Sequence, residues 1–131
     1  MRLDALHRLA TLERISDTTL VRAQRAAMID PTAPDASVEA VLHALIPFTF
    51  VDHTHADAVV ALTNTPHGAE LVAEVYGDRV LVVPYVMPGF PLARAVAELA
   101  KRIDWSRYEG MILLNTASSR GGTRRARATT R

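Results

Sequence analysis

The spacing of apolar residues predicts two helices at the start of the chain. Apolar residues recur at positions 3, 6, 9 and 12, as they do on one face of a helix. Ser16 has the short oxygen-bearing side chain that commonly precedes a helix, and it predicts a second helix over residues 18–28. Pro31 and Pro34 then interrupt the pattern, so we expect a loop at this point.

The middle of the chain alternates between short helices and one strand. Ser37 is suited to cap a short helix, and residues 46–51 have the composition of a short strand. Apolar spacing predicts two further helices, over residues 56–62 and 68–75, and Gly77 provides the residue type that often ends a helix.

The second half of the chain continues this alternation. Residues 79–84 and 111–114 are short apolar runs, and the first is rich in β-branched residues, so we expect two buried strands. Pro91 fits the first position of a helix that reaches about residue 103. Strands that alternate with helices favour an α/β layered domain.

Composition limits the class of protein. At 131 residues, with 49% apolar residues, the chain has the size of one domain and enough apolar side chains for a core. It contains no cysteine, so we expect neither a disulfide framework nor a thiolate metal site. No apolar run reaches the ~18 residues of a membrane span, and the N-terminus has no apolar signal segment. We therefore expect a cytoplasmic protein without a membrane partner.

Charge divides the chain into a body and a tail. All fourteen acidic residues lie before residue 116, whereas residues 116–131 carry five arginines. The tail has no apolar side chain larger than alanine, so it is predicted to be a disordered basic segment. A basic arm could bind nucleic acid, but the tail lacks the interleaved aromatic residues of such arms, and we do not expect that partner.

A His-x-His pair is the most specific chemical feature of the sequence. His53 and His55 follow the strand predicted over residues 46–51. Residues two apart in an extended chain point to the same side, so both imidazoles can reach one point. Zinc is commonly bound by such nitrogens at ~2.0–2.1 Å. The alternative is that the two histidines only form hydrogen bonds at the end of a strand.

Several motifs in order resemble the class II aldolase/adducin family. They are the Ser-Val-Glu segment with a histidine four residues later, the His-x-His pair, Pro-Tyr-Val-Met-Pro-Gly-Phe at 84–90 and Gly-Met-Ile-Leu-Leu-Asn at 110–115. The likeness covers roughly residues 3–115. It is greatest to the aldolase part of bifunctional proteins that join a rhamnulose-phosphate-type aldolase to a short-chain dehydrogenase.

This resemblance implies a fold, a cofactor and a reaction. The family's fold is an α/β/α layered domain, and its members form oligomers of identical subunits. The implied reaction is zinc-dependent aldol cleavage of a sugar phosphate through an enediolate, a lyase reaction of carbohydrate metabolism. Two alternatives are an epimerase that uses the same metal site and a non-catalytic, adducin-like binding or scaffold domain.

The resemblance also assigns roles to individual residues. His53 and His55 correspond to two zinc ligands, and Glu39 corresponds to the glutamate that acts as general base. His43 is expected to orient a ligand or to pack beneath the site. The family's third histidine would follow Asn115, where this chain has Thr116. The family's phosphate-binding segments would precede the first residue, so we expect an incomplete and impaired copy.

The tail invites a specific hypothesis about its origin. The family continues after Leu-Leu-Asn with a sequence like His-Gly-Ile-Phe-Ser. Loss of one base from GC-rich codons for these residues yields Thr-Ala-Ser-Ser-Arg, which is the sequence of residues 116–120. We therefore expect a partial aldolase domain over residues 1–115 and an out-of-frame tail over 116–131. The strands at 79–84 and 111–114 would then have unpaired edges.

Overall fold

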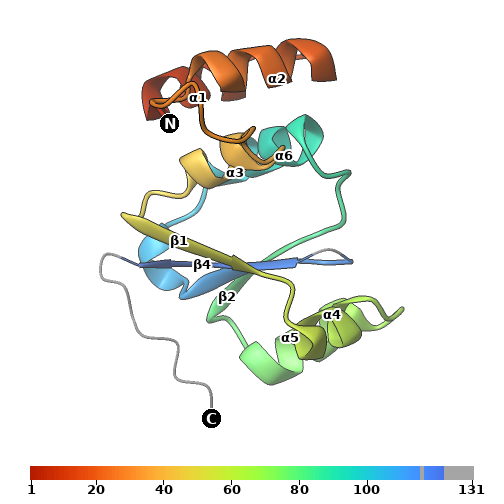
Figure 1. Ribbon diagram of the computed structural model, residues 1–131. Helices are drawn as coiled ribbons and strands as arrows, with labels where there is room; N and C mark the ends of the chain where they lie inside the picture. The colour runs from red at the N-terminus through yellow and green to blue at the C-terminus, as the bar shows by residue number, and fades with distance from the viewer. Residues whose placement is uncertain (116, 123–131) are drawn as a thin grey trace. The chain divides into compact units, whose positions relative to one another are not determined.

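The computed structural model describes residues 1–115 and 117–122. The chain forms two compact units, which are described separately. The helical unit combines Met1–Ile46 with Val86–Ile103, and the sheet unit combines Pro47–Tyr85 with the described residues after Ile103. Helices and a sheet thus share one chain (Figure 1), and the predicted α/β class is confirmed.

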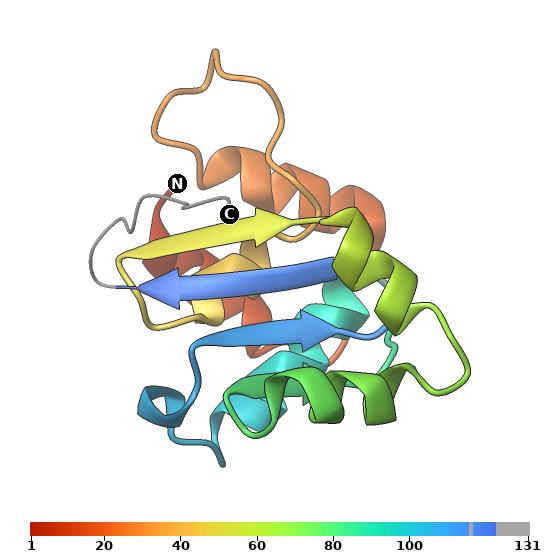
Figure 2. The ribbon, with the colours of Figure 1, turned by 90° about the horizontal axis from the view of Figure 1, so that it is seen from below.

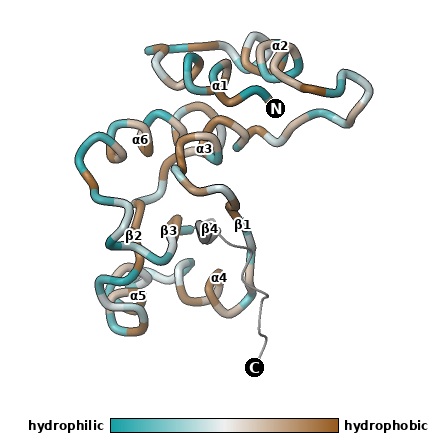
Figure 3. Tube along the Cα trace, turned by 90° about the vertical axis from the view of Figure 1, so that its left-hand side faces the viewer, coloured by the Kyte–Doolittle hydropathy of each residue, from teal (hydrophilic) through white to brown (hydrophobic). Residues whose placement is uncertain are grey.

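The helical unit contains four helices. They are α1 (Leu3–Ala10), α2 (Asp17–Ala26), α3 (Ala40–Leu45) and α6 (Phe90–Ala100). Helix α3 packs against both α1 and α6. The buried apolar residues of the unit include Leu6, Leu20, Val41, Leu42, Phe90, Leu92 and Val96. Figure 3 shows α3 mostly in hydrophobic colours, as expected for a helix that contributes to a core.

Two of these helices start within one residue of the predicted position. The Ser16 hydroxyl accepts a hydrogen bond from the Thr19 amide at 3.3 Å, so Ser16 caps α2. Pro91 lies in the first turn of α6, where a missing amide hydrogen leaves no bond unmade. Gly89 precedes this turn with φ of 98°, a conformation that favours glycine.

The sheet unit is built on four described strands. They are β1 (Phe50–Thr54), β2 (Val80–Val83), β3 (Gly110–Leu113) and β4 (Ala117–Gly122), in the order β1-β4-β3-β2. Strands β2 and β3 are parallel, and β4 runs antiparallel to both of its neighbours. Figure 2 shows the sheet with β4 between β1 and β3, pointing the opposite way.

Helices α4 (Asp57–Thr63) and α5 (Gly68–Tyr76) belong to the same unit, with a short 3₁₀ helix η1 (Trp105–Arg107). Helix α4 contacts α5 and β4, and α5 contacts β2. Gly77 ends α5 with φ of 61°, as the sequence indicated. No helix in residues 1–115 or 117–122 is long and apolar enough to cross a membrane.

Strand β4 is the main difference from the sequence prediction. Six residues of the predicted disordered tail form a strand that pairs on both sides, so the prediction of disorder fails at 117–122. Strand β3 consequently has no unpaired edge. Pairing uses backbone amides and carbonyls, so a segment of small residues can join a sheet without burying apolar side chains. Thr116 and residues 123–131 lie outside the described part, and the frameshift hypothesis is not tested by it.

Strand β1 begins later than predicted. The expected range was 46–51, whereas β1 spans Phe50–Thr54. Pro47 has no amide hydrogen and is poorly suited to a paired position in a sheet. Within β1 partly buried and exposed residues alternate, and His53 is on the partly buried side with Val51. The shift places His53 inside the strand and His55 directly after it.

Candidate metal centre

The two histidines of the motif lie side by side at the end of β1. The Nε2 atoms of His53 and His55 are 3.2 Å apart. The imidazole rings are nearly parallel, with 5.1 Å between centroids and 12° between planes. His53 is partly buried and His55 is exposed. The period-two geometry of an extended chain accounts for this convergence, because both side chains leave the same side of the backbone.

The spacing of the two nitrogens fits a shared zinc ion. Two nitrogens that are each ~2.0–2.1 Å from an ion with tetrahedral geometry lie about 3.3–3.4 Å apart. The observed 3.2 Å is close to this value. The same distance also allows one Nε2–H to donate a hydrogen bond to the other Nε2. Both interpretations that the sequence left open are therefore compatible with one geometry.

Glu39 and His43 belong to the helical unit, one turn apart at the N-cap and inside α3. Glu39 is the N-cap residue, and its carbonyl accepts the amide hydrogen of His43 at 3.0 Å. Both side chains are partly buried. Residues four apart share a face of a helix, so the two side chains leave α3 on the same side. This arrangement agrees with the four-residue spacing between the glutamate and the histidine of the motif.

Ser37 was expected to cap this helix, but the N-cap residue of α3 is Glu39. The Ser37 hydroxyl accepts a hydrogen bond from the Glu39 amide at 3.2 Å, and its carbonyl accepts one from the Ala40 amide at 3.0 Å. Ser37 therefore shapes the turn that leads into α3, while Glu39 occupies the cap position. The consequence is that the backbone of the proposed general base is held by Ser37.

Gln24 is a residue that the sequence analysis did not identify. Its side chain is only 2% exposed, and its Nε2 donates a hydrogen bond to the Ser37 carbonyl at 3.3 Å. The available signal was its position four residues after Leu20, which places an amide on the apolar face of α2. A buried amide needs a partner, and here that partner belongs to the turn of Glu39.

The remaining two histidines have ordinary surface roles. His7 is exposed, and its Nε2 bonds to the Ala44 carbonyl at 2.7 Å. His67 is exposed and pairs with the Glu70 carboxylate at 2.8 Å. Neither takes part in the candidate centre.

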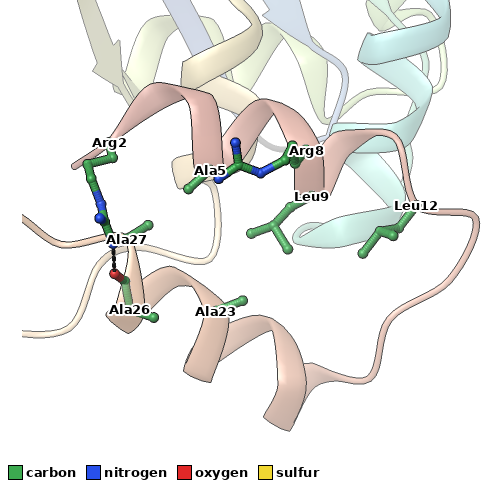
Figure 4. A pocket seen from close by; sticks show the side chains of 8 residues that line it. All are labelled: Arg2, Ala5, Arg8, Leu9, Leu12, Ala23, Ala26 and Ala27. Atoms are coloured by element: carbon green, nitrogen blue, oxygen red, sulfur yellow. Dashed lines mark hydrogen bonds between the residues drawn. The ribbon is translucent and has the colours of Figure 1, made fainter.

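A groove in the helical unit lies between α1 and α2. It has a volume of about 380 Å³, and alanines and leucines form most of its lining, together with Arg2 and Arg8. Figure 4 shows the Arg2 side chain reaching the Ala26 carbonyl, to which it donates a hydrogen bond of 2.6 Å. No carboxylate or imidazole lines this groove, so it offers no group for acid–base chemistry.

Comparison with known proteins agrees with the motifs. The family model of the class II aldolase and adducin N-terminal domain matches residues 7–123. YuxG, an uncharacterized oxidoreductase of Bacillus subtilis (strain 168), is 37% identical over 98 residues, which are 75% of this chain and 14% of that protein.

A solved structure supports the same assignment. The N-terminal class II aldolase domain of a conserved protein from Thermoplasma acidophilum has a TM-score of 0.80 and 32% sequence identity. The match covers 94% of this chain and 55% of that one, so the chain spans about half or less of the length of both relatives. The family model covers most of the sequence, including β4, and the chain belongs to the class II aldolase/adducin family.

Proposed function

We propose that this chain is the metal-binding part of an aldolase-type domain that cleaves a sugar phosphate with the help of zinc. The observation that supports it most directly is the 3.2 Å separation of the Nε2 atoms of His53 and His55. This separation matches two ligands of one tetrahedral ion, and the family to which the chain belongs gives the pair that role.

The proposed roles follow from the chemistry of each side chain. His53 and His55 would hold the ion through neutral Nε2 atoms. A bound zinc ion would supply Lewis-acid polarisation of the substrate carbonyl. Glu39 would accept a proton from a substrate hydroxyl, since a carboxylate acts as a general base when it is within reach of that proton. His43 would orient these groups without binding the ion.

The ligand set of this chain differs from the family pattern. Zinc sites in catalysis use three protein ligands and one open position. The residue after Asn115 is Thr116, whose hydroxyl is a poorer zinc ligand than imidazole. We therefore propose weak zinc binding by the histidine pair with help from Glu39. A cytoplasmic location and an oligomer of identical chains are part of the same proposal.

The alternative is a binding or scaffold domain without catalysis. It is favoured by one observation, namely that each of the two histidines can satisfy the other through a hydrogen bond. In that case the pair stabilises the end of β1 and needs no ion. The two proposals differ in whether the purified chain retains zinc through these side chains.

Elemental analysis after dialysis separates the two proposals. We expect the parent chain to retain zinc, and His53→Ala and His55→Ala each to lose it. His67→Ala is the matched control, because His67 is exposed and pairs with Glu70. Equal zinc content in the parent and in both pair variants would reject the metal centre and favour the scaffold function.

A further inference from the structure

The turn that carries Glu39 is held from outside α3 by a buried amide. Gln24 lies on α2 with 2% of its surface exposed, and its Nε2 bonds to the Ser37 carbonyl at 3.3 Å. The Ser37 hydroxyl in turn accepts the Glu39 amide hydrogen at 3.2 Å. Two hydrogen bonds, one to the carbonyl and one to the hydroxyl of Ser37, thus connect a buried side chain of α2 to the backbone of Glu39 through Ser37.

We infer that Gln24 is a positioning residue for Glu39 and acts through Ser37; the inference rests on the proposed function. A general base must be placed within hydrogen-bond reach of the proton it removes. A small displacement of a general base from this position lowers the reaction rate, so the residues that hold the base in place affect catalysis. Gln24 never needs to touch the substrate or the metal in this role.

An exposed ion pair beside Gln24 serves as a comparison for the Gln24 hydrogen bond. Arg25, next to Gln24, forms an ion pair with Asp35 in the loop before Ser37. Both side chains of that pair are more than half exposed, at 53% and 62%. Exposed pairs contribute little because water and salt screen them. The bond from Gln24 is part-buried and Gln24 itself is 2% exposed, so loss of this bond should destabilise the turn more than loss of the exposed ion pair.

Gln24→Met tests the inference with little change in side-chain volume. Amide exchange measured by NMR should become about tenfold faster at Glu39 and Ala40, since one hydrogen bond to Ser37 is lost. Arg25→Gln is the matched control from the same helix, and we expect its effect to stay within about twofold. Unchanged exchange at Glu39 and Ala40 in Gln24→Met would overturn the inference.

A double-mutant cycle on zinc affinity tests whether this turn affects the proposed zinc binding. We expect Gln24→Met to weaken zinc binding by about threefold to tenfold in the parent, and by less than about twofold when Glu39 is replaced by glutamine. Thr63→Val removes the hydroxyl of another buried polar residue and controls for general loss of stability. Equal weakening in both backgrounds would show that Gln24 acts on the fold and not through Glu39.

The two parts of the experiment distinguish failure of the inference from failure of the proposed function. If the parent chain keeps no zinc on His53 and His55, the proposed function fails and amide exchange alone decides whether Gln24 positions Glu39. If zinc binds and Gln24→Met changes neither exchange nor affinity, the inference fails while the proposed function stands.

Discussion

The local conformation of the backbone determines where individual side chains of this chain point. His53 and His55 are brought together because residues two apart in an extended backbone share a side. Gln24 lies on the buried side of α2 with Leu20 because residues four apart share a face of a helix. In both cases the local backbone conformation, extended or helical, decides which side chains lie on the same side.

Gly68 offers a residue-scale test in the sheet unit. A Cβ built on Gly68 would lie 2.6 Å from the Thr63 carbonyl oxygen, so the start of α5 approaches the end of α4 too closely for any side chain. We expect Gly68→Ala to lower the free energy of unfolding by about 1–3 kcal/mol, since the backbone must shift. Urea denaturation followed by circular dichroism measures this change.

Ala69→Ser is the control for that substitution. Ala69 is an exposed residue of the same first turn, and we expect a change within about 0.5 kcal/mol. If Gly68→Ala were as stable as the parent, the close approach of the two helices would be refuted.

At the scale of elements, termini decide where each helix and strand begins. Ser16 caps α2, Ser37 shapes the turn before α3, and Asp104 caps the short helix η1. The Asp104 carboxylate accepts hydrogen bonds from the Ser106 amide at 3.0 Å and from the Ser106 hydroxyl at 2.7 Å. The chain therefore enters the segment before β3 through a capped turn.

The cap at Asp104 predicts a dependence of stability on pH. The Ser106 hydroxyl, followed by the Ser106 amide, lowers the pKa of Asp104 from its usual value of 3.8. A carboxyl with a lowered pKa stabilises the fold above its unfolded pKa, and this contribution disappears as the pH falls through the folded pKa.

Asp104→Ala should therefore lower the urea midpoint at pH 6, and the difference from the parent should shrink as the solution is acidified below pH 3.8. Asp78→Ala is the control, as an exposed aspartate of the same unit. A difference that stayed constant from pH 6 to strong acid would contradict a role for the charged cap.

At the scale of the whole molecule, this chain carries a family domain, and the metal-ligand set that we propose for it departs from the family pattern. The family model matches residues 7–123, while Thr116 stands where the family has its third histidine. The chain also spans 14% of one relative and 55% of another. Catalysis by this chain would therefore require the proposed ligands to fix the positions of both zinc and substrate.

We expect this chain alone to show no detectable cleavage of ketose phosphates. Positioning of reactants can account for ~7–11 kcal/mol of a barrier, and a loosely held ion cannot supply it. A coupled assay for the aldehyde and ketone products, with added zinc, measures the activity. Robust zinc-dependent turnover that Glu39→Gln abolishes would contradict this prediction, and the Glu70→Gln variant controls for loss of a surface charge.

Elements with strong local signals could be predicted from the sequence. Helix α2 began after its cap at Ser16, and α5 ended at Gly77. Strand β2 fell within the apolar run at 79–84, and β3 overlapped the run at 111–114 but began and ended one residue earlier. Each of these depends on neighbours along the chain, which a sequence displays directly. The His-x-His pair was visible for the same reason.

Only the tertiary structure decided the pairing of β4 between β1 and β3, and the contact of Gln24 with Ser37. Strand pairing uses backbone groups that every residue has, so residues 117–122 carry no apolar pattern that would mark them as a strand. The Gln24 contact joins residues that are distant along the chain, and only folding brings such groups together. The sequence by itself determined local periods, caps and the family motifs, whereas long-range pairing supplied the centre of the sheet and the support for Glu39.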